Sequence, residues 1–179
     1  MFRYGKRVLM VFAAIYIGMM AAACDEKDPK KESNSKGNTT TTAASKDETF
    51  GLNETAVFSD LKIAAIEIKA SGGSEYNKPG SGNVFVGVKF TIENISNQDQ
   101  IISSILLFDA YADDVKSDLS ITASMEFNSK TLDGTVAPGK KLIGYYTMEV
   151  PTTTKMIELN VKSDWLSNAK AKFVLDMPK

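Results

Sequence analysis

The chain contains no histidine, a single cysteine and only two arginines, both of which lie within the first seven residues. The absence of histidine excludes Ser-His and Cys-His catalytic pairs and imidazole metal ligands. Because no arginine follows position 7, the rest of the chain also lacks the bidentate clamp with which arginine holds phosphate or carboxylate groups. No other residue combination marks a catalytic centre or a cofactor site. We therefore expect a protein that is not an enzyme and that needs no cofactor.

The first 24 residues have the layout of a secretory signal. A basic head at residues 3–7 precedes the apolar run Val8–Met20, and the small residues Ala21-Ala22-Ala23 lead to Cys24. The apolar stretch from Val8 to Ala23 is 16 residues long, whereas a membrane-spanning helix needs ~20. The sequence therefore predicts a signal peptide over residues 1–23, in preference to a permanent transmembrane anchor.

A lone cysteine directly after this signal resembles the lipobox of bacterial lipoproteins. In that family the cysteine is acylated with chains such as palmitate and becomes the first residue of the mature protein. The resemblance implies that Cys24 is lipidated and holds the chain on the extracytoplasmic face of the cell membrane. Several acyl chains make such anchoring lasting, because each buried methylene contributes ~0.8 kcal/mol. Ordinary secretion with a free thiol at the mature end is the alternative.

A polar segment follows the cysteine. From Asp25 to Thr49 the only apolar residues are Ala43 and Ala44, and five lysines nearly balance six acidic residues. Such a segment buries too little apolar surface to offset the entropy lost on ordering. We therefore expect residues 24–52 to form a flexible linker, which would lift the domain clear of the lipid headgroups.

The remaining residues, 53–179, are expected to form one domain rich in β-strands. Apolar residues alternate with polar ones over several stretches, as in half-buried strands. Leu61, Ile63, Ile66 and Ile68 change parity near Ala64-Ala65, which indicates a bulge or a break. Ala137-Pro138-Gly139-Lys140 predicts a type II turn. The expected strands lie near residues 56–58, 61–68, 84–93, 101–111, 131–136, 142–150, 157–161 and 171–175.

Helical periodicity is scarce, with at most one turn near Val115–Leu119 and another near Asp164–Asn168. Seven to eight short strands separated by loops rich in Gly, Pro, Ser and Asn favour an all-β antiparallel β-sandwich. The chain from Cys24 onward has no cysteine pair, so this sandwich has no disulfide.

Four segments in order resemble a family of uncharacterised exported bacterial domains. They are residues 86–94, 108–113, 132–141 and 144–151, which read VGVKFTIEN, FDAYAD, LDGTVAPGKK and GYYTMEVP. Members of that family are immunoglobulin-like β-sandwiches, often on lipoproteins, and are similar to a small secreted immunogenic antigen of mycobacteria. The resemblance implies an immunoglobulin-like fold. It implies no activity, because the family has none assigned.

A cluster of acidic residues offers a candidate metal site. Asp109, Asp113, Asp114 and Asp118 are closely spaced, and carboxylate oxygens are the ligands that Ca²⁺ prefers. Their spacing does not follow the EF-hand pattern. A strand end and loop exposed to solvent would carry the same residues, so we assign no metal here.

Exposed aromatic side chains could stack on sugars; the candidates are Tyr76, Tyr111, Tyr145 and Trp165. Residues 50–179 carry 13 lysines and 16 acidic residues, which argues against nucleic acid as a partner. We expect the partners to be the membrane, through the lipid anchor, and a protein or another cell-envelope component bound by the domain. A small glycan- or Ca²⁺-binding module of the cell envelope is the alternative function.

Overall fold

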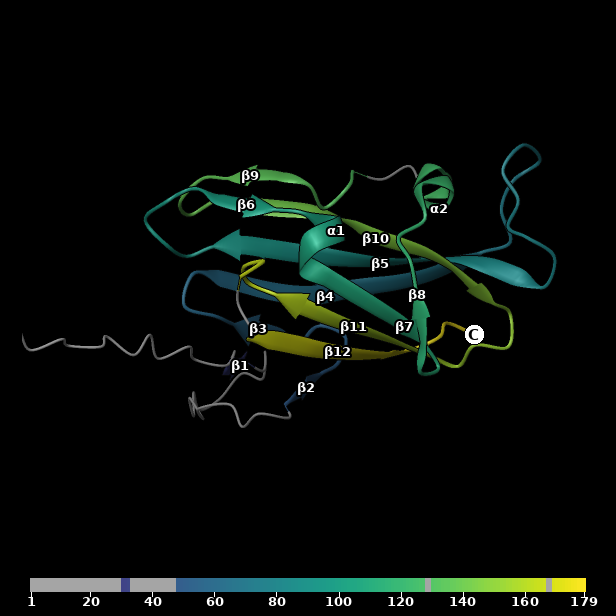
Figure 1. Cartoon of the computed structure of the whole chain (residues 1–179), viewed down its shortest axis with the longest axis horizontal. Helices are drawn as coiled ribbons and strands as arrows, with labels where there is room; N and C mark the ends of the chain where they lie inside the picture. Colours follow the sequence, from purple (N-terminus) through teal and green to yellow (C-terminus); the bar gives the residue numbers. More distant parts are fainter. Residues whose placement is uncertain (1–29, 33–47, 128–129, 167–168) are drawn as a thin grey trace, which may run out of the picture.

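Short and long strands dominate the described part of the chain, which in this computed structural model comprises residues 30–32, 48–127, 130–166 and 169–179 (Figure 1). Its strands are β1 (Lys30–Glu32), β2 (Thr49–Phe50), β3 (Thr55–Val57), β4 (Leu61–Ser71), β5 (Asn83–Asn94), β6 (Gln100–Ile102), β7 (Phe108–Ala112), β8 (Val115–Ser117), β9 (Gly134–Val136), β10 (Lys141–Pro151), β11 (Met156–Lys162) and β12 (Lys170–Asp176). Its helices are α1 (Ser104–Leu107) and α2 (Ile121–Glu126).

The first sheet has the strand order β1-β3-β4-β5-β10, and all its strands run antiparallel. The long strands β5 and β10 pair over their whole length, from Asn83 opposite Pro151 to Glu93 opposite Lys141. On β4 the register shifts between Ala65 and Glu67. This bulge confirms the irregularity that the change of parity predicted.

The second sheet has the order β2-β12-β11-β7-β8. Its strands pair antiparallel, except that β2 runs parallel to β12 with Phe50 opposite Phe173. The strands β6 and β9 form a separate antiparallel pair. The two larger sheets form the two layers of the sandwich, with β6, β9 and α2 along one edge (Figure 1).

The core lies between the two sheets and is fixed by a chain of aromatic contacts. The Phe90 ring on β5 lies 5.3 Å from that of Phe108 on β7 and 5.4 Å from that of Phe173 on β12. The Phe108 ring also stacks on that of Tyr146 on β10, at 5.4 Å. All four residues are at most 5% exposed. The fold is thus the β-sandwich that the strand patterns predicted.

The edge of β10 is covered by the chain between β8 and β9. Leu119 bridges to Met148 and Thr131 bridges to Tyr145. The Ser120 amide donates to the Thr147 carbonyl at 2.8 Å, and the Thr147 hydroxyl donates back to the Ser120 carbonyl at 2.8 Å. Covering this edge removes the unpaired row of backbone groups at which another chain could add a strand.

The expected strand over residues 101–111 is wrong. The chain forms β6, then the helix α1, then β7, and these two strands belong to different sheets. The helix carries the chain from the pair with β9 to the pair with β11. Near 115–119 and 164–168, where the sequence allowed at most a helical turn, the described residues are not helical: Val115–Ser117 is strand β8, and the helix that follows begins at Ile121.

The expected linker over residues 24–52 also differs from the structure at its described positions. Strand β1 adds to the edge of β3, and β2 adds to the edge of β12. Phe50 is 1% exposed and its ring lies 5.4 Å from that of Phe173, so the sandwich includes residues before position 53. A single large apolar side chain is enough to draw this end of the linker into the core.

Candidate functional site

The residue expected to be lipidated, Cys24, lies outside the described residues, as do the apolar run Val8–Met20 and the rest of the first 29 residues. In the part of the chain that the structure describes, no helix is long and apolar enough to cross a bilayer.

The carboxylate of Asp113 is engaged by backbone groups. It accepts hydrogen bonds from the Lys155 amide, at 3.0 and 3.1 Å, and from the Met156 amide, at 2.9 Å. Asp113 has a φ of +45° and Asp114 a φ of +71°, so the pair forms the tight turn between β7 and β8. Asp113 thus fastens this turn to the start of β11, which is a structural role.

Asp109 and Asp118, the other two acidic residues considered as metal ligands, do not form a metal site either. Asp109 lies on β7 and its carboxylate is 3.6 Å from the ammonium of Lys116 on β8. Asp118 follows β8 in an exposed loop. Among the described residues no three acidic or cysteine side chains gather closely enough to hold a metal ion. The close spacing in sequence is therefore not matched by a cluster in space.

Among the candidate sugar-stacking aromatics, Tyr145 belongs to a cluster on the outer face of the first sheet. Its ring stacks on that of Phe127 at 5.8 Å, and the ammonium of Lys89 lies 5.5 Å from its centre. The Tyr145 hydroxyl donates to the carboxylate of Glu67, which also lies 3.0 Å from the ammonium of Lys69.

These contacts shift the pKa values of Glu67 and Tyr145 in opposite directions. The hydrogen bond from Tyr145 and the neighbouring Lys69 lower the pKa of Glu67. Burial and the hydrogen bond to Glu67 raise the pKa of Tyr145. The face of the Tyr145 ring is taken by Phe127 and Lys89, so it is poorly placed to stack on a sugar.

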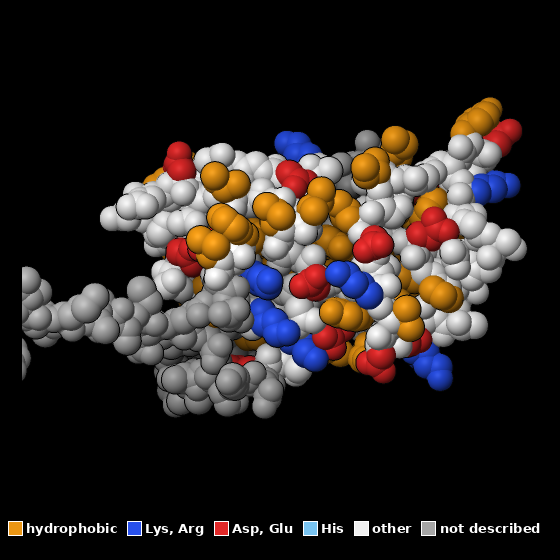
Figure 2. Space-filling view, viewed as in Figure 1, with side chains coloured by type: hydrophobic (Ala, Val, Ile, Leu, Met, Phe, Trp, Pro, Cys, Tyr) orange, Lys and Arg blue, Asp and Glu red, His pale blue; other side chains and the backbone are white. Residues whose placement is uncertain are grey.

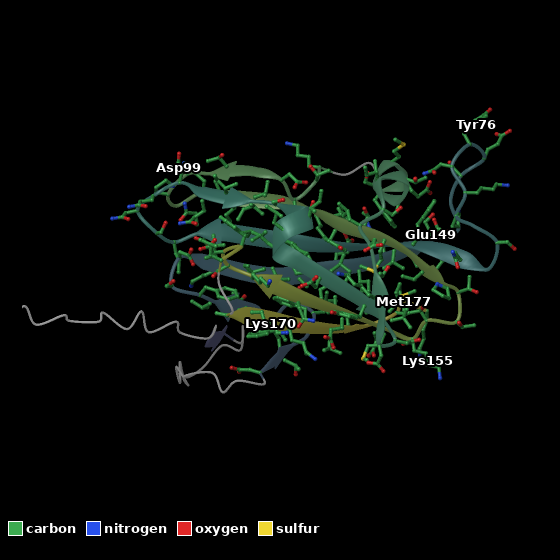
Figure 3. The ribbon with its side chains drawn as sticks, in the orientation of Figure 1. Tyr76, Asp99, Glu149, Lys155, Lys170 and Met177 are labelled. Carbon is green, nitrogen blue, oxygen red and sulfur yellow. The ribbon has the colours of Figure 1, made fainter. Side chains whose placement is uncertain are left out.

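The remaining aromatic candidates lie apart from one another. Tyr111 is on β7 and half-buried, whereas Tyr76 is 93% exposed in the loop between β4 and β5. Trp165 is 65% exposed in the loop between β11 and β12. Figure 3 shows Tyr76 at the tip of a loop that projects from one end of the molecule. The structure therefore does not bring the four candidate aromatics together into one binding platform.

Large apolar side chains gather instead on the surface over β6, α1 and the loop after β11 (Figure 2). Five of them are from 60% to 78% exposed, and we refer to these five as the apolar patch: Ile101, Ile105, Leu106, Trp165 and Leu166. Monomeric soluble proteins rarely expose contiguous apolar surface without a function, so this patch is the candidate interaction site.

The strand register explains why the two halves of the apolar patch lie at one end of the second sheet. Phe108, the first residue of β7, pairs with Val161 near the end of β11. The helix α1 ends directly before Phe108, and the loop with Trp165 begins directly after β11. Two segments about 60 positions apart in sequence are thereby placed beside each other.

Polar groups beside the apolar patch hold its backbone in place. The Ser104 amide and hydroxyl both donate to the carboxylate of Asp133, at 2.9 Å for the amide, and so fix the start of α1. Asp164 accepts from the Leu166 amide at 3.2 Å, which shapes the loop around Trp165. Lys162 and Lys170 pair with each other across β11 and β12 at the base of this loop.

Sequence reasoning assigned Ile101, Ile105 and Leu106 to a strand and so missed the patch. A signal was present: positions 101, 102, 105, 106 and 107 are apolar on both parities, which a half-buried strand does not allow. Trp165 was noted as a sugar-stacking candidate, but its neighbours in space come from a distant segment. Only the pairing of β7 with β11 brings them together.

A shallow hollow lies between β8 and α2 and is lined by residues 116–122 and Glu149. The Glu149 carboxylate already accepts from the Gly80 amide at 2.8 Å and from the Asn83 side chain at 2.9 Å. These bonds lower the pKa of Glu149. The carboxylate thus fastens the loop before β5 to β10, and we assign the hollow no chemistry.

Two solved structures, both from Bacillus subtilis, resemble this fold. A protein described as a putative lipoprotein (ycdA) superposes with a TM-score of 0.55 and 16% identity, over 65% of this chain and 36% of that one. The chain thus spans about a third of the length of that protein. The yjhA protein superposes with a TM-score of 0.51 and 15% identity, over 72% of this chain and 99% of that one.

At such low identities these likenesses concern the fold alone. The search of curated proteins gave no match. A family model does match, over residues 50–172, and this range runs from the buried Phe50 into β12 and includes strands of both sheets of the sandwich. The chain therefore belongs to the family described as Domain of unknown function (DUF4352).

Proposed function

We propose that this protein is a lipoprotein anchored through acylated Cys24 on the extracytoplasmic face of the cell membrane, where its β-sandwich acts as a binding domain without catalytic activity. The anchor is supported by the basic head, the apolar run and the cysteine that follows Ala23. The fold is consistent with this location, because one solved structure of the same fold is described as a putative lipoprotein. Kinship with small secreted mycobacterial antigens is part of the same proposal.

The observation that carries the binding role is the apolar patch. Five large apolar side chains from two separate segments are exposed at one end of a sandwich whose core is otherwise closed. Exposure of a Leu or Ile side chain forgoes roughly 1.5–3 kcal/mol that burial would contribute. A surface of this kind is expected where a partner covers it.

Metabolic labelling with a palmitate analogue tests the anchor. We expect the wild-type chain to incorporate the label and Cys24→Ser to lose it completely, because the thiol is the acceptor. Ser33→Ala, a change in the linker that keeps the cysteine, serves as the matched control and should label like the wild type. Label that persists in Cys24→Ser, or a wild-type chain without label, would refute the anchor.

Fractionation provides the second measurement. After processing at the Ala-x-Ala sequence, the Cys24→Ser chain should appear in the soluble extracytoplasmic fraction, whereas the wild-type chain should stay with the membranes. Processed Cys24→Ser protein that remains bound to membranes would mean that acyl chains on Cys24 are not what holds the protein there.

A further inference from the structure

Strand β1, the first described segment after Cys24 in the sequence, begins at the end of the sandwich that carries the apolar patch. In β1, Lys30 pairs with Val57 and Glu32 pairs with Thr55. Lys30, the first residue of β1, therefore lies at the Val57 end of β3. That end leads into the turn before β4, where the Phe58 amide donates to the Leu61 carbonyl at 2.8 Å.

The turn between β3 and β4 lies near the loop that carries Trp165. Asp60 in this turn has a raised pKa, mainly because it is partly buried and in addition because the negative charge of Asp164 is close. Asp164 directly precedes Trp165. Strand β2 enters at the same region, since Thr49 pairs with Lys172 of β12.

The length of the connection to Cys24 limits which part of the domain can face the lipid. Lys30 is six positions after Cys24, so the connecting chain spans at most ~20 Å. Strand β5 has 12 residues, so the sandwich is ~40 Å long in this direction. With β1 paired to β3, the acyl chains reach only the near end of the domain. Figure 3 shows Tyr76 and Glu149 at the opposite end from Lys170 and Asp99.

The chemistry of the apolar patch suits a bilayer interface. Its five members are Trp, Leu and Ile side chains, and tryptophan prefers the boundary between headgroups and acyl chains. Lys170 is exposed and Lys162 is half-buried at the base of the Trp165 loop. Lysine side chains of this kind can lay their methylenes along apolar surface while the ammonium contacts lipid phosphate.

We propose that the apolar patch inserts into the interface of the bilayer that holds the acyl chains of Cys24, so that the sandwich lies against the membrane with this end down. The inference rests on the proposed lipid anchor. The lipid anchor keeps the apolar patch close to the bilayer, so the effective concentration of lipid at the patch is high. A weak affinity of the patch for the bilayer is then sufficient for insertion. Pairing of β1 with β3 keeps the connection between Cys24 and the sandwich short, and we refer to β1 as the clamp.

Trp165 is the only tryptophan in the chain, so its fluorescence reports directly on the patch. We would reconstitute the full acylated protein into vesicles of phosphatidylcholine and phosphatidylglycerol, with and without brominated acyl chains. Insertion predicts a blue-shifted Trp165 emission and loss of most of its intensity with brominated lipid. Anchored protein whose emission is unshifted and unquenched would overturn the inference while leaving the anchor intact.

A matched control places the reporter at the far end of the molecule. The double variant Trp165→Phe/Tyr76→Trp keeps one tryptophan but moves it to the exposed loop between β4 and β5. Its emission should be unshifted and unquenched. Equal quenching at both positions would contradict the proposed orientation.

Variants of the apolar patch and of strand β1 test the two parts of the proposal separately. Ile105→Ser/Leu106→Ser changes exposed side chains only and should abolish most of the quenching of Trp165. Glu32→Pro removes the backbone N–H of the Glu32–Thr55 pair between β1 and β3 and should reduce the quenching, because it releases the clamp. Quenching that is unaffected by Ile105→Ser/Leu106→Ser would overturn the role of the patch.

The same measurements separate the membrane from a second copy of the chain as occupant of the patch. A blue shift without quenching by brominated lipid, together with a dimer in sedimentation, would overturn the membrane as partner. If the chain proves not to be acylated, Cys24→Ser protein added to excess vesicles still tests whether the apolar patch inserts into the bilayer. Quenched Trp165 would support insertion, and unquenched Trp165 would refute it.

Discussion

The side chain of Asn94 is fully buried, and its hydrogen bonds join three segments at the end of β5. Its amide donates to the carbonyls of Gln98 and Val136, each at 2.7 Å. Its carbonyl accepts from the amide and the hydroxyl of Ser96, at 2.9 and 2.7 Å. In the sequence, Asn94 and Asn97 lie at a polar turn, where asparagine side chains often bond nearby backbone, so this pattern alone treats the two alike. It does not reveal the contact with Val136, which depends on the fold.

Replacing Asn94 with alanine should lower the free energy of unfolding by about 1–3 kcal/mol, because buried carbonyls and a backbone amide lose their partners. Urea unfolding measures the change. Asn97→Ala, at an exposed position of the same turn, should stay within about 0.5 kcal/mol of the wild type. Equal effects of the two substitutions would contradict the role given to Asn94.

Ionisation of the Tyr146 hydroxyl makes the free energy of unfolding depend on pH in the alkaline range. Burial, and to a lesser degree the negative charges of Asp118 and Asp109, raise the pKa of its hydroxyl to about 12. The unfolded chain loses this proton near pH 10. The folded state therefore binds more protons than the unfolded state above pH 10, and stability falls as the pH rises from 10 through 12.

Between pH 9 and pH 11.5, wild-type protein should lose about 2 kcal/mol more stability than Tyr146→Phe, which has no proton to lose. Urea unfolding at both pH values gives the comparison. Tyr76→Phe, at a position that is 93% exposed, should follow the wild type. A parallel decline of Tyr146→Phe and wild type would show that the Tyr146 hydroxyl is not protected by burial.

At the scale of elements, close approach of backbone segments explains a glycine in the middle of β10. A Cβ atom at Gly144 would lie 2.6 Å from the Lys130 carbonyl oxygen and 2.9 Å from that of Thr131. These carbonyls belong to the segment that covers the edge of β10, where the Tyr145 amide donates to the Lys130 carbonyl at 3.1 Å. A glycine here lets that segment pack against the strand.

Gly144→Ala should therefore destabilise the protein by roughly 1–3 kcal/mol and increase hydrogen exchange in the segment that covers β10. Gly72→Ala is the matched control, because a Cβ there would meet nothing within 4 Å. Unchanged exchange of the Tyr145 amide in Gly144→Ala would contradict the packing described here.

The strands with alternating apolar residues could be predicted from sequence, because β5, β10, β11 and β12 each turn alternate residues to the core. Burial on the opposite face, as at Phe85 of β5 and Thr147 of β10, depends on the fold. The turn before β10 could be predicted as well: Gly139 has a φ of +70° and the Lys140 amide donates to the Ala137 carbonyl at 3.0 Å. Local residue preferences dictate these features.

The elements around α1 could not be predicted in the same way. Ile105 and Leu106 are exposed although they are apolar. The spacing of apolar residues in this segment therefore does not mark which positions are buried. The edge strands β1 and β2 depend on pairing with distant partners. Their own sequences, apart from Phe50, carry no strand pattern.

At the scale of the whole molecule, the apolar patch and the exposed loop with Tyr76 lie toward opposite ends of the sandwich. Strands β1 and β2 pair with β3 and β12 at the end that carries the apolar patch. The sequence predicted the anchor and the sandwich as separate parts joined by a long spacer. Pairing of β1 with β3 shortens that spacer, and under the proposed lipid anchor this pairing would give the domain a defined orientation.

The intact mass of the chain extracted from membranes tests the central claim most directly. The account predicts a polypeptide that begins at Cys24 and carries the added mass of two or three acyl chains. A chain that begins at Cys24 or Asp25 without added mass, or one that retains residues 1–23, would contradict the account.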